Sequence, residues 1–444
     1  MGRPAGCRER MHRYPTGEGR SMPSDRYPGL AAVLDAIRRE DGVTQPILVE
    51  RVGLGRSVVA QRVAELEEAG LVVSRGLGPS TGGRAPRRLG LRADAGRVLG
   101  ADIATNEVVV AVADLAGDLQ ATRQEEIDVT DGPDIVIGIV ERMARAIVEE
   151  TGTGGELWAI GLGMPGPVAY DGGAAATMPT MPEWSRHPTV QRMASAFGAP
   201  AWMDDRVNLS ALGERRVNPL AAASRNLVYM GGGYGIGAAV VVGGQLHRGA
   251  HGLAGAIDHM PVPGVEGVVC GCGNLGCLEA VAGGAALARD GRRLAESGES
   301  PVLAEVLTRT GRIRPGDVTA AAGRGDPAAR ALLHRAAVVL GASLATLVNV
   351  FDPDLVVIGG GIARARAHVL AAIREEIYRR AMPAATRDLR IEPSAVDQEV
   401  AGVTGAVEFA LARLFEPGNL PSVLDARLRA RPEAAPGEGA GLTA

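Results

Sequence analysis

Two strand-rich segments constrain the fold of this 444-residue chain more than any other feature of its sequence. The first begins at residue 97, where RVLGADIA, EVVVAVADLAG and LQATRQEEIDV predict three strands, followed by a helix at about 133–150 and the apolar strand LWAIGLG. The second begins near residue 226 with NLVYMGGG and GIGAAVVVGGQL, and continues later with PDLVVIGGG and a long helix. Two similar halves of this kind predict a duplicated α/β fold with a cleft between two lobes.

Residues 29–95 differ from this pattern, because their apolar residues recur at helical intervals in short, closely spaced segments. It predicts three helices, with Thr44 as the N-cap of the second and Gly53 just after its end. The segments LVVSRG and RRLGLR then predict two short strands around a hairpin rich in glycine and proline. Helix, helix, tight turn, helix and hairpin is the order of a winged helix-turn-helix. We therefore predict an N-terminal, all-α winged helix-turn-helix domain.

Both ends of the chain lack such periodicity. Residues 1–28 and 417–444 are rich in glycine, proline and arginine, which is typical of segments that cannot bury a core. We therefore expect two disordered tails, and the remaining residues 96–416 form the α/β domain.

The distribution of charge favours nucleic-acid binding by the N-terminal part alone. Residues 1–100 contain 17 arginines and 11 acidic residues, a net charge of +6, so the overall charge of −4 leaves −10 for the rest. The N-terminus lacks the apolar segment of a signal peptide, and no apolar run approaches the roughly 20 residues that cross a bilayer. Only four cysteines are present, with three of them clustered, which also favours the cytoplasm.

The third predicted helix, RSVVAQRVAELEEAG, carries side chains suited to reading DNA. Its first turns offer arginine and glutamine, which pair bidentately with guanine and adenine in the major groove. The hairpin segment STGGRAPRR adds arginines that can reach phosphates or a narrow minor groove. A merely solvated helix face is the alternative for the helix alone, and the basic wing favours DNA. The predicted DNA contacts are Arg56, Ser57, Val58, Gln61 and Arg62 on the helix, and Arg84, Arg87 and Arg88 on the wing.

Three cysteines and a histidine have the spacing of a metal site, His259-x10-Cys270-x-Cys272-x4-Cys277. Three thiolates and an imidazole are a complete ligand set for four-coordinate structural zinc, whereas catalytic zinc keeps a position open for water. Buried free thiols and an iron–sulfur cluster are the alternatives. The pattern predicts one structural zinc ion per chain.

Several segments resemble the ROK family, whose name stands for repressors, open reading frames and sugar kinases. They are GLGMPGPV, RGAHGLAGAIDHM, CGCGNLGCLE and DPDLVVIGGGI, and the wing segment GPSTGGRAPRRLGL is similar to the transcriptional-repressor branch. The resemblance covers roughly residues 29–415. It implies an actin-like (ribonuclease-H-like, duplicated) two-lobed fold, a homodimer or homotetramer, and a sugar bound in the cleft beside the zinc loop.

Kinases of this family hold phosphate with two turns, and both turns are altered here. The first, usually Asp-x-Gly-x-Thr, is DIATN, so Ala104 and Asn106 replace glycine and threonine while Asp102 remains. A β-carbon at the glycine position obstructs close approach of the backbone to phosphate. In the second turn, usually Gly-Thr-Gly-Ile-Gly, Tyr234 replaces the threonine.

The catalytic base of the family is also changed. Anchored by the shared NLSALGE, the segment DDRVN aligns with the usual Glu-Asn-Asp-x-Asn and puts Arg206 at the position of the catalytic aspartate. A guanidinium cannot accept a proton at neutral pH. A shift by one residue would give Asp205 this role but would break the match at Val207 and Asn208. We therefore predict that the chain is not an enzyme.

The sugar-binding residues that the resemblance implies are only partly kept. Ala256 stands at a sugar-holding glutamate and Asp258 at the glycine two positions later. One nitrogen of His259 would bind the metal, and its other nitrogen could meet a ligand. The possible effector-binding residues are Thr180 and Asp205, which both replace asparagines, together with Arg206, His259 and Glu279.

Together these features predict a cytoplasmic, dimeric regulator of transcription, of the repressor type, that binds an inverted-repeat operator in double-stranded DNA and is nucleoid-associated when bound. Its kinase-like domain senses a sugar or sugar-derived effector, in carbohydrate metabolism, or only dimerises. One alternative is an ATP-dependent sugar kinase of the glucokinase or N-acetyl amino sugar kinase type, fused to a DNA-binding domain. The other is a scaffold that binds DNA constitutively, which a ligand-dependent change in operator affinity would distinguish from a sensor.

Overall fold

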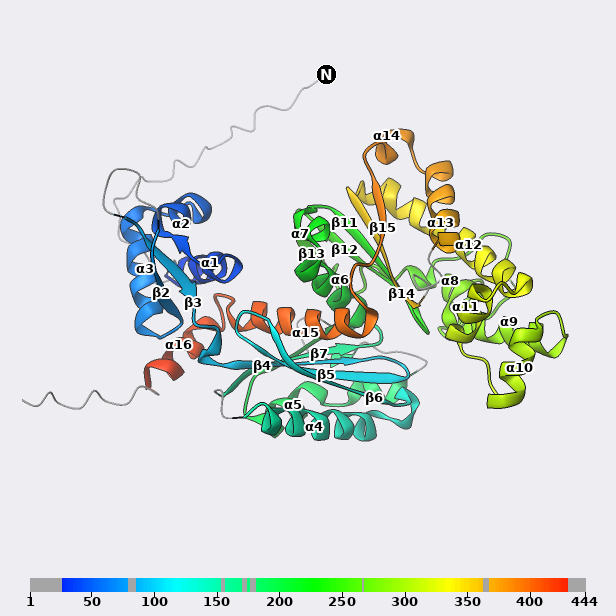
Figure 1. Cartoon of the computed structure of the whole chain (residues 1–444), viewed down its shortest axis with the longest axis horizontal. Helices are drawn as coiled ribbons and strands as arrows, with labels where there is room; N and C mark the ends of the chain where they lie inside the picture. The colour runs from blue at the N-terminus through cyan, green and yellow to red at the C-terminus, as the bar shows by residue number, and fades with distance from the viewer. Residues whose placement is uncertain are drawn as a thin grey trace, which may run out of the picture. The chain divides into compact units, whose positions relative to one another are not determined.

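The protein is described by a computed structural model that covers residues 26–78, 85–152, 156–169, 174–175, 181–265, 267–361 and 367–429. The chain divides into two compact units, one made of Met1–Gly90 with Phe415–Ala444 and the other of Leu91–Leu414. Figure 1 colours both units along the chain, from blue at the N-terminus to red at the C-terminus.

The smaller unit has the predicted winged helix-turn-helix fold. Its helices enclose buried leucines and valines, and Gly53 ends the second helix with a left-handed φ of 66°. The hairpin gains a third, two-residue strand that the sequence pattern did not predict, giving the sheet order β1-β3-β2. The elements are α1 (Arg26–Arg39), β1 (Val43–Thr44), α2 (Gln45–Val52), α3 (Arg56–Glu68), β2 (Val72–Leu77) and β3 (Arg87–Leu91).

The C-terminal segment also belongs to this smaller unit. Residues Leu420–Arg429 form helix α16, which contacts α1, and Leu420 and Leu424 are buried. The predicted disordered tail from residue 417 is therefore wrong over this helix. The segment is rich in proline and arginine, but it also carries a short apolar stripe at helical spacing. This stripe is sufficient to stabilise a helix when it packs against α1. Residues 26–28 of the predicted N-terminal tail begin α1, residues 417–419 form a turn, and residues 1–25 and 430–444 lie outside the described residues.

The larger unit contains two five-stranded sheets that repeat the same pairing pattern. In each sheet the first strand pairs antiparallel with the next strand along the chain and parallel with a later one. The first sheet has the order β10-β7-β4-β5-β6 and the second β13-β12-β11-β14-β15, which confirms the predicted duplicated fold. The strands are β4 (Arg97–Ile103), β5 (Glu107–Asp114), β6 (Leu119–Glu126), β7 (Leu157–Met164), β10 (Ala201–Asp205), β11 (Leu227–Gly232), β12 (Ile236–Val242), β13 (Gln245–His247), β14 (Leu355–Gly360) and β15 (Arg390–Pro393).

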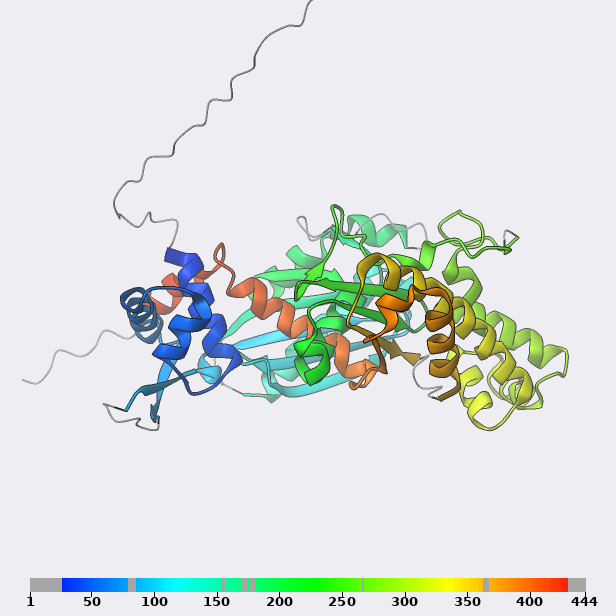
Figure 2. The ribbon, with the colours of Figure 1, turned by 90° about the horizontal axis from the view of Figure 1, so that it is seen from above.

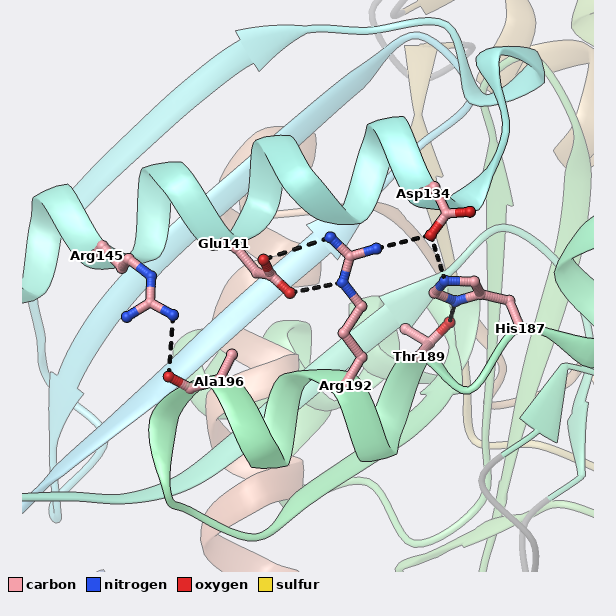
Figure 3. A network of polar contacts seen from close by, with 7 residues as sticks. All are labelled: Asp134, Glu141, Arg145, His187, Thr189, Arg192 and Ala196. Carbon is pink, nitrogen blue, oxygen red and sulfur yellow. Dashed lines mark hydrogen bonds and ion pairs between the residues drawn. The ribbon is translucent and has the colours of Figure 1, made fainter.

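Helices α4 (Pro133–Glu150) and α5 (Thr189–Phe197) cover one face of the first sheet and share its apolar core. On their outer side they are joined by a polar network (Figure 3). There Arg192 contacts Glu141 at 2.7 Å and Asp134 at 2.9 Å, while His187 approaches Asp134 and bonds to Thr189 at 2.8 Å. The network holds α5 against α4, on the face of the first sheet opposite to the one that helix α15 (Gln398–Leu414) covers.

Helices α6 (Arg206–Val217) and α15 (Gln398–Leu414) lie on the inner faces of the two sheets. Helix α15 packs on β4 and β7 of the first sheet, and α6 packs on β11 and β12 of the second. The two helices also pack against each other, and their glycines allow backbone contact: a Cβ atom at Gly213 or Gly405 would overlap a carbonyl group of the opposite helix. Figures 1 and 2 show α15 running along the first sheet.

The outer face of the second sheet is covered by a large helical layer with a continuous apolar core. Helix α12 (Pro327–Phe351) is long and apolar enough to cross a bilayer by length and composition alone, but 56% of its most apolar window is buried inside the protein. It is therefore the central helix of this core. The other α-helices and strands of the unit are α7 (Pro219–Ala223), α8 (Leu278–Ala282), α9 (Gly284–Glu296), α10 (Pro301–Thr310), α11 (Pro315–Gly323), α13 (Ala367–Arg380), α14 (Pro383–Thr386), and the short strands β8 (Val168–Ala169) and β9 (Ala174–Ala175).

Candidate functional site

The predicted recognition helix α3 presents a polar face to solvent and an apolar face to the core. Val59, Val63 and Leu66 are buried, as the apolar spacing predicts. The exposed side chains near its start are those of Arg56, Ser57, Val58 and Gln61.

Arg62 does not belong to this exposed face, so its predicted role as a base contact is not compatible with the structure. It is only 8% exposed, and its guanidinium forms an ion pair with Glu65 at 2.7 Å. The physical reason is the helical period, since residue 62 lies beside residues 59, 63 and 66 on the inner face.

The wing strands carry several exposed arginines. Arg87 pairs with Glu67, and Arg88 donates from Nε to the carbonyl of Gly42 at 3.3 Å. Arg75 on β2, which the sequence analysis did not single out, is half-exposed and pairs with Asp41. Arg84 lies outside the described residues. These ion pairs are exposed and therefore weak enough to be exchanged for phosphate contacts.

The four predicted metal ligands come together in one loop. The ligand atoms of His259, Cys270, Cys272 and Cys277 all lie within 4.8 Å of one another. Cys272 Sγ is 3.7 Å from Cys277 Sγ, and Cys270 Sγ is 3.7 Å from Nδ1 of His259. Zinc–sulfur bonds of about 2.3 Å in a tetrahedron place two sulfurs about 3.8 Å apart, so the cluster fits a tetrahedral metal ion of this size.

Backbone bonds fold the loop around these ligands. The N–H of Cys270 donates to the carbonyl of Asn274 at 2.8 Å, and Gly273 and Gly276 turn the chain with left-handed φ values of 92° and 66°. Burial raises the pKa of the Cys277 thiol to about 12, so this thiol needs a cation to ionise at neutral pH.

The second ring nitrogen of His259 faces a carboxylate. Its Nε2 lies 3.1 Å from Oδ2 of Asp258, so an effector that bonds to this nitrogen would share it with the carboxylate. A carboxylate in this place orients a metal-bound imidazole and raises its basicity. Sequence reasoning noted Asp258 only as a departure from the family pattern.

Arg206 and Asp102 form a buried ion pair. Nε of Arg206 donates to both carboxylate oxygens of Asp102, at 3.0 and 2.9 Å, and Asp102 is 1% exposed. Burial raises the pKa of Asp102, whereas the adjacent guanidinium favours the charged carboxylate. Asp102, the residue retained from the family's first phosphate turn, is therefore bound by Arg206, the residue that stands at the position of the catalytic base.

The two altered turns are also closed. Ala104 is buried, and its N–H donates to the carbonyl of Glu107 at 2.8 Å within the β4–β5 hairpin. In the second turn the N–H of Ile236 donates to Oε2 of Glu279 at 2.7 Å. Both backbone donors are thus used within the protein.

Three acidic side chains meet beside the metal loop. Burial, with a smaller contribution from the carboxylate of Asp258, raises the pKa of Asp205 and that of Glu279 to about 7. Asp258 therefore interacts with three of the expected effector residues, Asp205, Glu279 and His259. Asp204, next to Asp205, is paired with Arg248 at 2.7 Å. Thr180 lies outside the described residues.

Fold and site together define a DNA-binding winged helix-turn-helix joined to a two-lobed sugar-kinase-like domain with a cysteine-rich loop. The winged helix-turn-helix DNA-binding family matches residues 32–73, and the ROK family matches residues 98–413. The chain belongs to the ROK family.

Curated relatives include both repressors and kinases. The chain is 26% identical over 384 residues to the xylose repressor of Caldicellulosiruptor bescii, covering 86% of this chain and 95% of that protein. It is 30% identical over 321 residues to the glucokinase of Streptomyces coelicolor, covering 71% of this chain and 98% of that protein. The match to the repressor therefore extends over more of this chain.

Among solved structures, a ROK family transcriptional regulator described as a homologue of the E. coli Mlc protein matches with a TM-score of 0.75 and 22% identity. The match covers 90% of this chain and all of the other. At this identity the likeness concerns the fold, which therefore confirms the predicted combination of a winged helix-turn-helix with an actin-like ROK domain.

Proposed function

We propose that this chain is a sequence-specific DNA-binding repressor of transcription whose ROK domain senses a small effector. The observation that carries the proposal is helix α3, which offers Arg56, Ser57, Val58 and Gln61 to solvent at the start of the recognition helix of a winged unit. Exposed arginines of the wing supply a surface for phosphates, and relatives named xylose repressor share nearly the whole chain.

The ROK domain of this repressor has no sugar kinase activity in our proposal. Phosphoryl transfer to a hydroxyl needs an acceptor for its proton and donors around the phosphates. Arg206 is bound to Asp102 at the position of the base, and Ala104 uses its N–H within its own hairpin. The glucokinases among the relatives support the opposite reading, a kinase fused to a DNA-binding domain, against which these contacts argue.

We further propose that the cysteine-rich loop holds one structural zinc ion through His259, Cys270, Cys272 and Cys277. The 3.7 Å separations and the full set of four protein ligands support zinc in a closed site. When bound, zinc supplies rigidity to the loop and fixes the His259–Asp258 contact beside Glu279. Zinc would not supply catalysis, because no coordination position is left for water.

The proposed effector is a sugar or sugar-derived molecule bound near Asp205, Arg206, His259 and Glu279, with Thr180 as a further contact. Carboxyl groups accept hydrogen bonds from sugar hydroxyls, and groups that titrate near neutral pH can also donate them. A homodimer or homotetramer in the cytoplasm, nucleoid-associated when bound to its operator, would place two recognition helices on an inverted repeat.

Genome-wide mapping of the DNA bound by the full-length protein tests the proposal. We expect a small number of sites that share an inverted repeat, and fluorescence anisotropy on these duplexes should show at least 1,000-fold tighter binding than on scrambled DNA. Titration of D-xylose and D-glucose should weaken binding for one of them, which separates a sensor from a constitutive scaffold. Equal binding to both duplexes would contradict the proposal.

A further inference from the structure

The Asp102–Arg206 ion pair lies where four elements of the larger unit meet. Asp102 is on β4, Arg206 begins α6, and the Asp102 carboxylate also touches β7 and α15. A Cβ atom at Gly163 would be 3.0 Å from one carboxylate oxygen, and a Cβ atom at Gly402 would overlap the other. The carboxylate is therefore enclosed by the backbone of α15 on one side and held by Arg206 on the other.

Helix α15 cannot shift independently of α6. The two helices make close backbone contacts, since a Cβ atom at Gly405 would overlap the carbonyl of Leu209, and one at Gly213 would overlap that of Ala401. Interfaces this tightly packed change between discrete arrangements and do not deform gradually. A displacement of the start of α6 is therefore transmitted to α15.

Both chain connections to the DNA-binding unit begin at elements that enclose Asp102. The chain passes from wing strand β3, which ends at Leu91, into β4 at Arg97. At the other end it passes from α15, which ends at Leu414, into α16 at Leu420. Helix α16 is part of the DNA-binding unit and packs on α1 through buried leucines.

The effector side of the pair is Asp205, the residue before Arg206. Its Oδ1 accepts from the N–H of Val207 at 3.0 Å and caps the start of α6. A molecule that bonds to Asp205 therefore acts on the first turn of α6, next to the arginine. Nη2 of Arg206 is buried and makes no hydrogen bond in the described part of the chain. The guanidinium can therefore donate a further hydrogen bond if the side chain of Arg206 changes its position.

We propose that the Asp102–Arg206 pair couples effector occupancy near Asp205 to the DNA-binding unit, with α6, α15 and α16 as the connecting elements. The inference rests on the proposed function, because it assigns Arg206 and Asp102 a positioning role in a regulator that responds to an effector. The arginine that replaces a catalytic base would thus serve in signal transmission.

Hydrogen–deuterium exchange on the full chain without any sugar tests the coupling. Asp102→Asn keeps the shape of the side chain but removes its charge, and Gly402→Ala displaces α15 from the carboxylate without changing any charge. We expect both variants to raise exchange in α6 and α15 and, by at least threefold, in α16 and α1. The control is Glu141→Gln, which weakens a less buried ion pair with Arg192 on the outer side of the same unit (Figure 3).

The control should leave exchange in α16 and α1 at the wild-type rate. If Asp102→Asn and Gly402→Ala raise exchange in α6 and α15 but leave α16 and α1 unchanged, the coupling proposal is wrong. The same conclusion holds if Glu141→Gln affects α16 as strongly as they do. If one variant fails to fold, the other still decides between these outcomes.

A second measurement uses D-xylose and D-glucose as probes. In wild-type protein, the sugar that acts should change the operator Kd about 5- to 150-fold, the usual range of allosteric coupling. In Asp102→Asn and Gly402→Ala this factor should fall below twofold, while Glu141→Gln keeps it. An undiminished factor in both variants would contradict the coupling alone. Absence of operator binding by wild-type protein would contradict the proposed function, and the exchange measurement would still decide the coupling.

Discussion

Arginine at position 206 changes both the charge and the hydrogen-bonding capacity of the site in which it lies. An aspartate at this position could accept a proton, whereas the guanidinium only donates, and here it donates to both oxygens of Asp102. The pair is buried, so removing one partner would leave an uncompensated charge and cost about 3–5 kcal/mol of stability. The two residues should therefore be studied as a pair.

Restoring the acid alone should not create a kinase. We expect wild-type protein and Arg206→Asp to phosphorylate no hexose or N-acetylated amino sugar above the no-enzyme background in a coupled assay with magnesium and ATP. In the variant, two carboxylates would face each other at positions 102 and 206, and the altered turns at Ala104 and Tyr234 would remain. Turnover near 1 s⁻¹, ordinary for a kinase, by the wild-type protein would overturn the proposal.

Asp205 gives a prediction on pH dependence. Burial raises its pKa from 3.8 to about 7, with the charges of Asp204 and Asp258 adding to the rise and that of Arg206 opposing it. The folded state thus holds the proton more tightly than the unfolded state. The stability that this proton contributes is fully present below about pH 4 and is lost as the pH rises through 7.

Asp205→Asn should therefore stabilise the protein more at pH 8.5 than at pH 6, by about 1–2 kcal/mol. The amide oxygen can still accept from the N–H of Val207, so the cap of α6 is preserved. Urea unfolding at the two pH values measures the difference. An equal effect at both values would show that Asp205 is not protonated in the folded protein near neutral pH.

Some of these residue-scale features follow from the sequence and others do not. The four metal ligands lie within nineteen positions, and their spacing alone brings them together. The partner of Arg206 is 104 positions away, so only the fold identifies it. The burial of Arg62 was missed because an arginine near the start of a recognition helix suggests DNA, although its helical position beside Val59 and Val63 already indicated the core.

At the scale of elements, the cysteine-rich loop should depend on its metal. We expect one zinc ion per chain by elemental analysis of freshly purified protein, and loss of this zinc in Cys272→Ser. Faster proteolysis of the loop should accompany the loss, because short backbone bridges alone hold it otherwise. Asn274→Ala, which changes a side chain within the same loop but removes no ligand, is the control. Equal metal content in both variants would contradict the ligand assignment.

Helix α3 and the wing should contribute differently to DNA binding. Gln61→Ala removes a side chain that can reach a base edge, so it should cost about 1–3 kcal/mol on the operator and relax the preference at one base pair per half-site. Arg88→Ala should weaken operator and random DNA alike and reduce the salt dependence by about one unit. Anisotropy over a salt series measures both. The same specificity profile for the two variants would show that α3 is not the recognition helix.

Element-scale prediction from the sequence was accurate where periodicity was long. The halves of the ROK domain were recognisable because buried strands such as β5 and β11 contain continuous apolar runs. Helix α16 was missed because its ten residues carry only a few apolar side chains, and its stability comes from α1, almost 400 positions away. The local periodicity of a sequence does not identify short elements whose stability depends on residues far away in the chain.

At the scale of the whole molecule, a basic first hundred residues and an acidic remainder separate the DNA-binding function from the body. The body carries a net charge of −10, so it is repelled by DNA and restricts contact to the winged unit. A single winged unit offers one recognition helix, and its contact area is small for a specific complex. For specific binding we therefore expect two copies to bind together.

We expect the protein to bind as a dimer to an inverted repeat whose half-sites are separated by about 10–10.5 bp or a multiple of this, so that both copies of α3 face the same side of the duplex. Light scattering of the free protein and of its complex gives the number of chains, and footprinting gives the spacing. Insertion of 5 bp between the half-sites rotates one of them by half a turn and should reduce affinity to that of a single half-site, whereas insertion of 10 bp should restore part of it. If the 5 bp insertion leaves affinity unchanged, the two recognition helices do not bind the repeat as one rigid dimer.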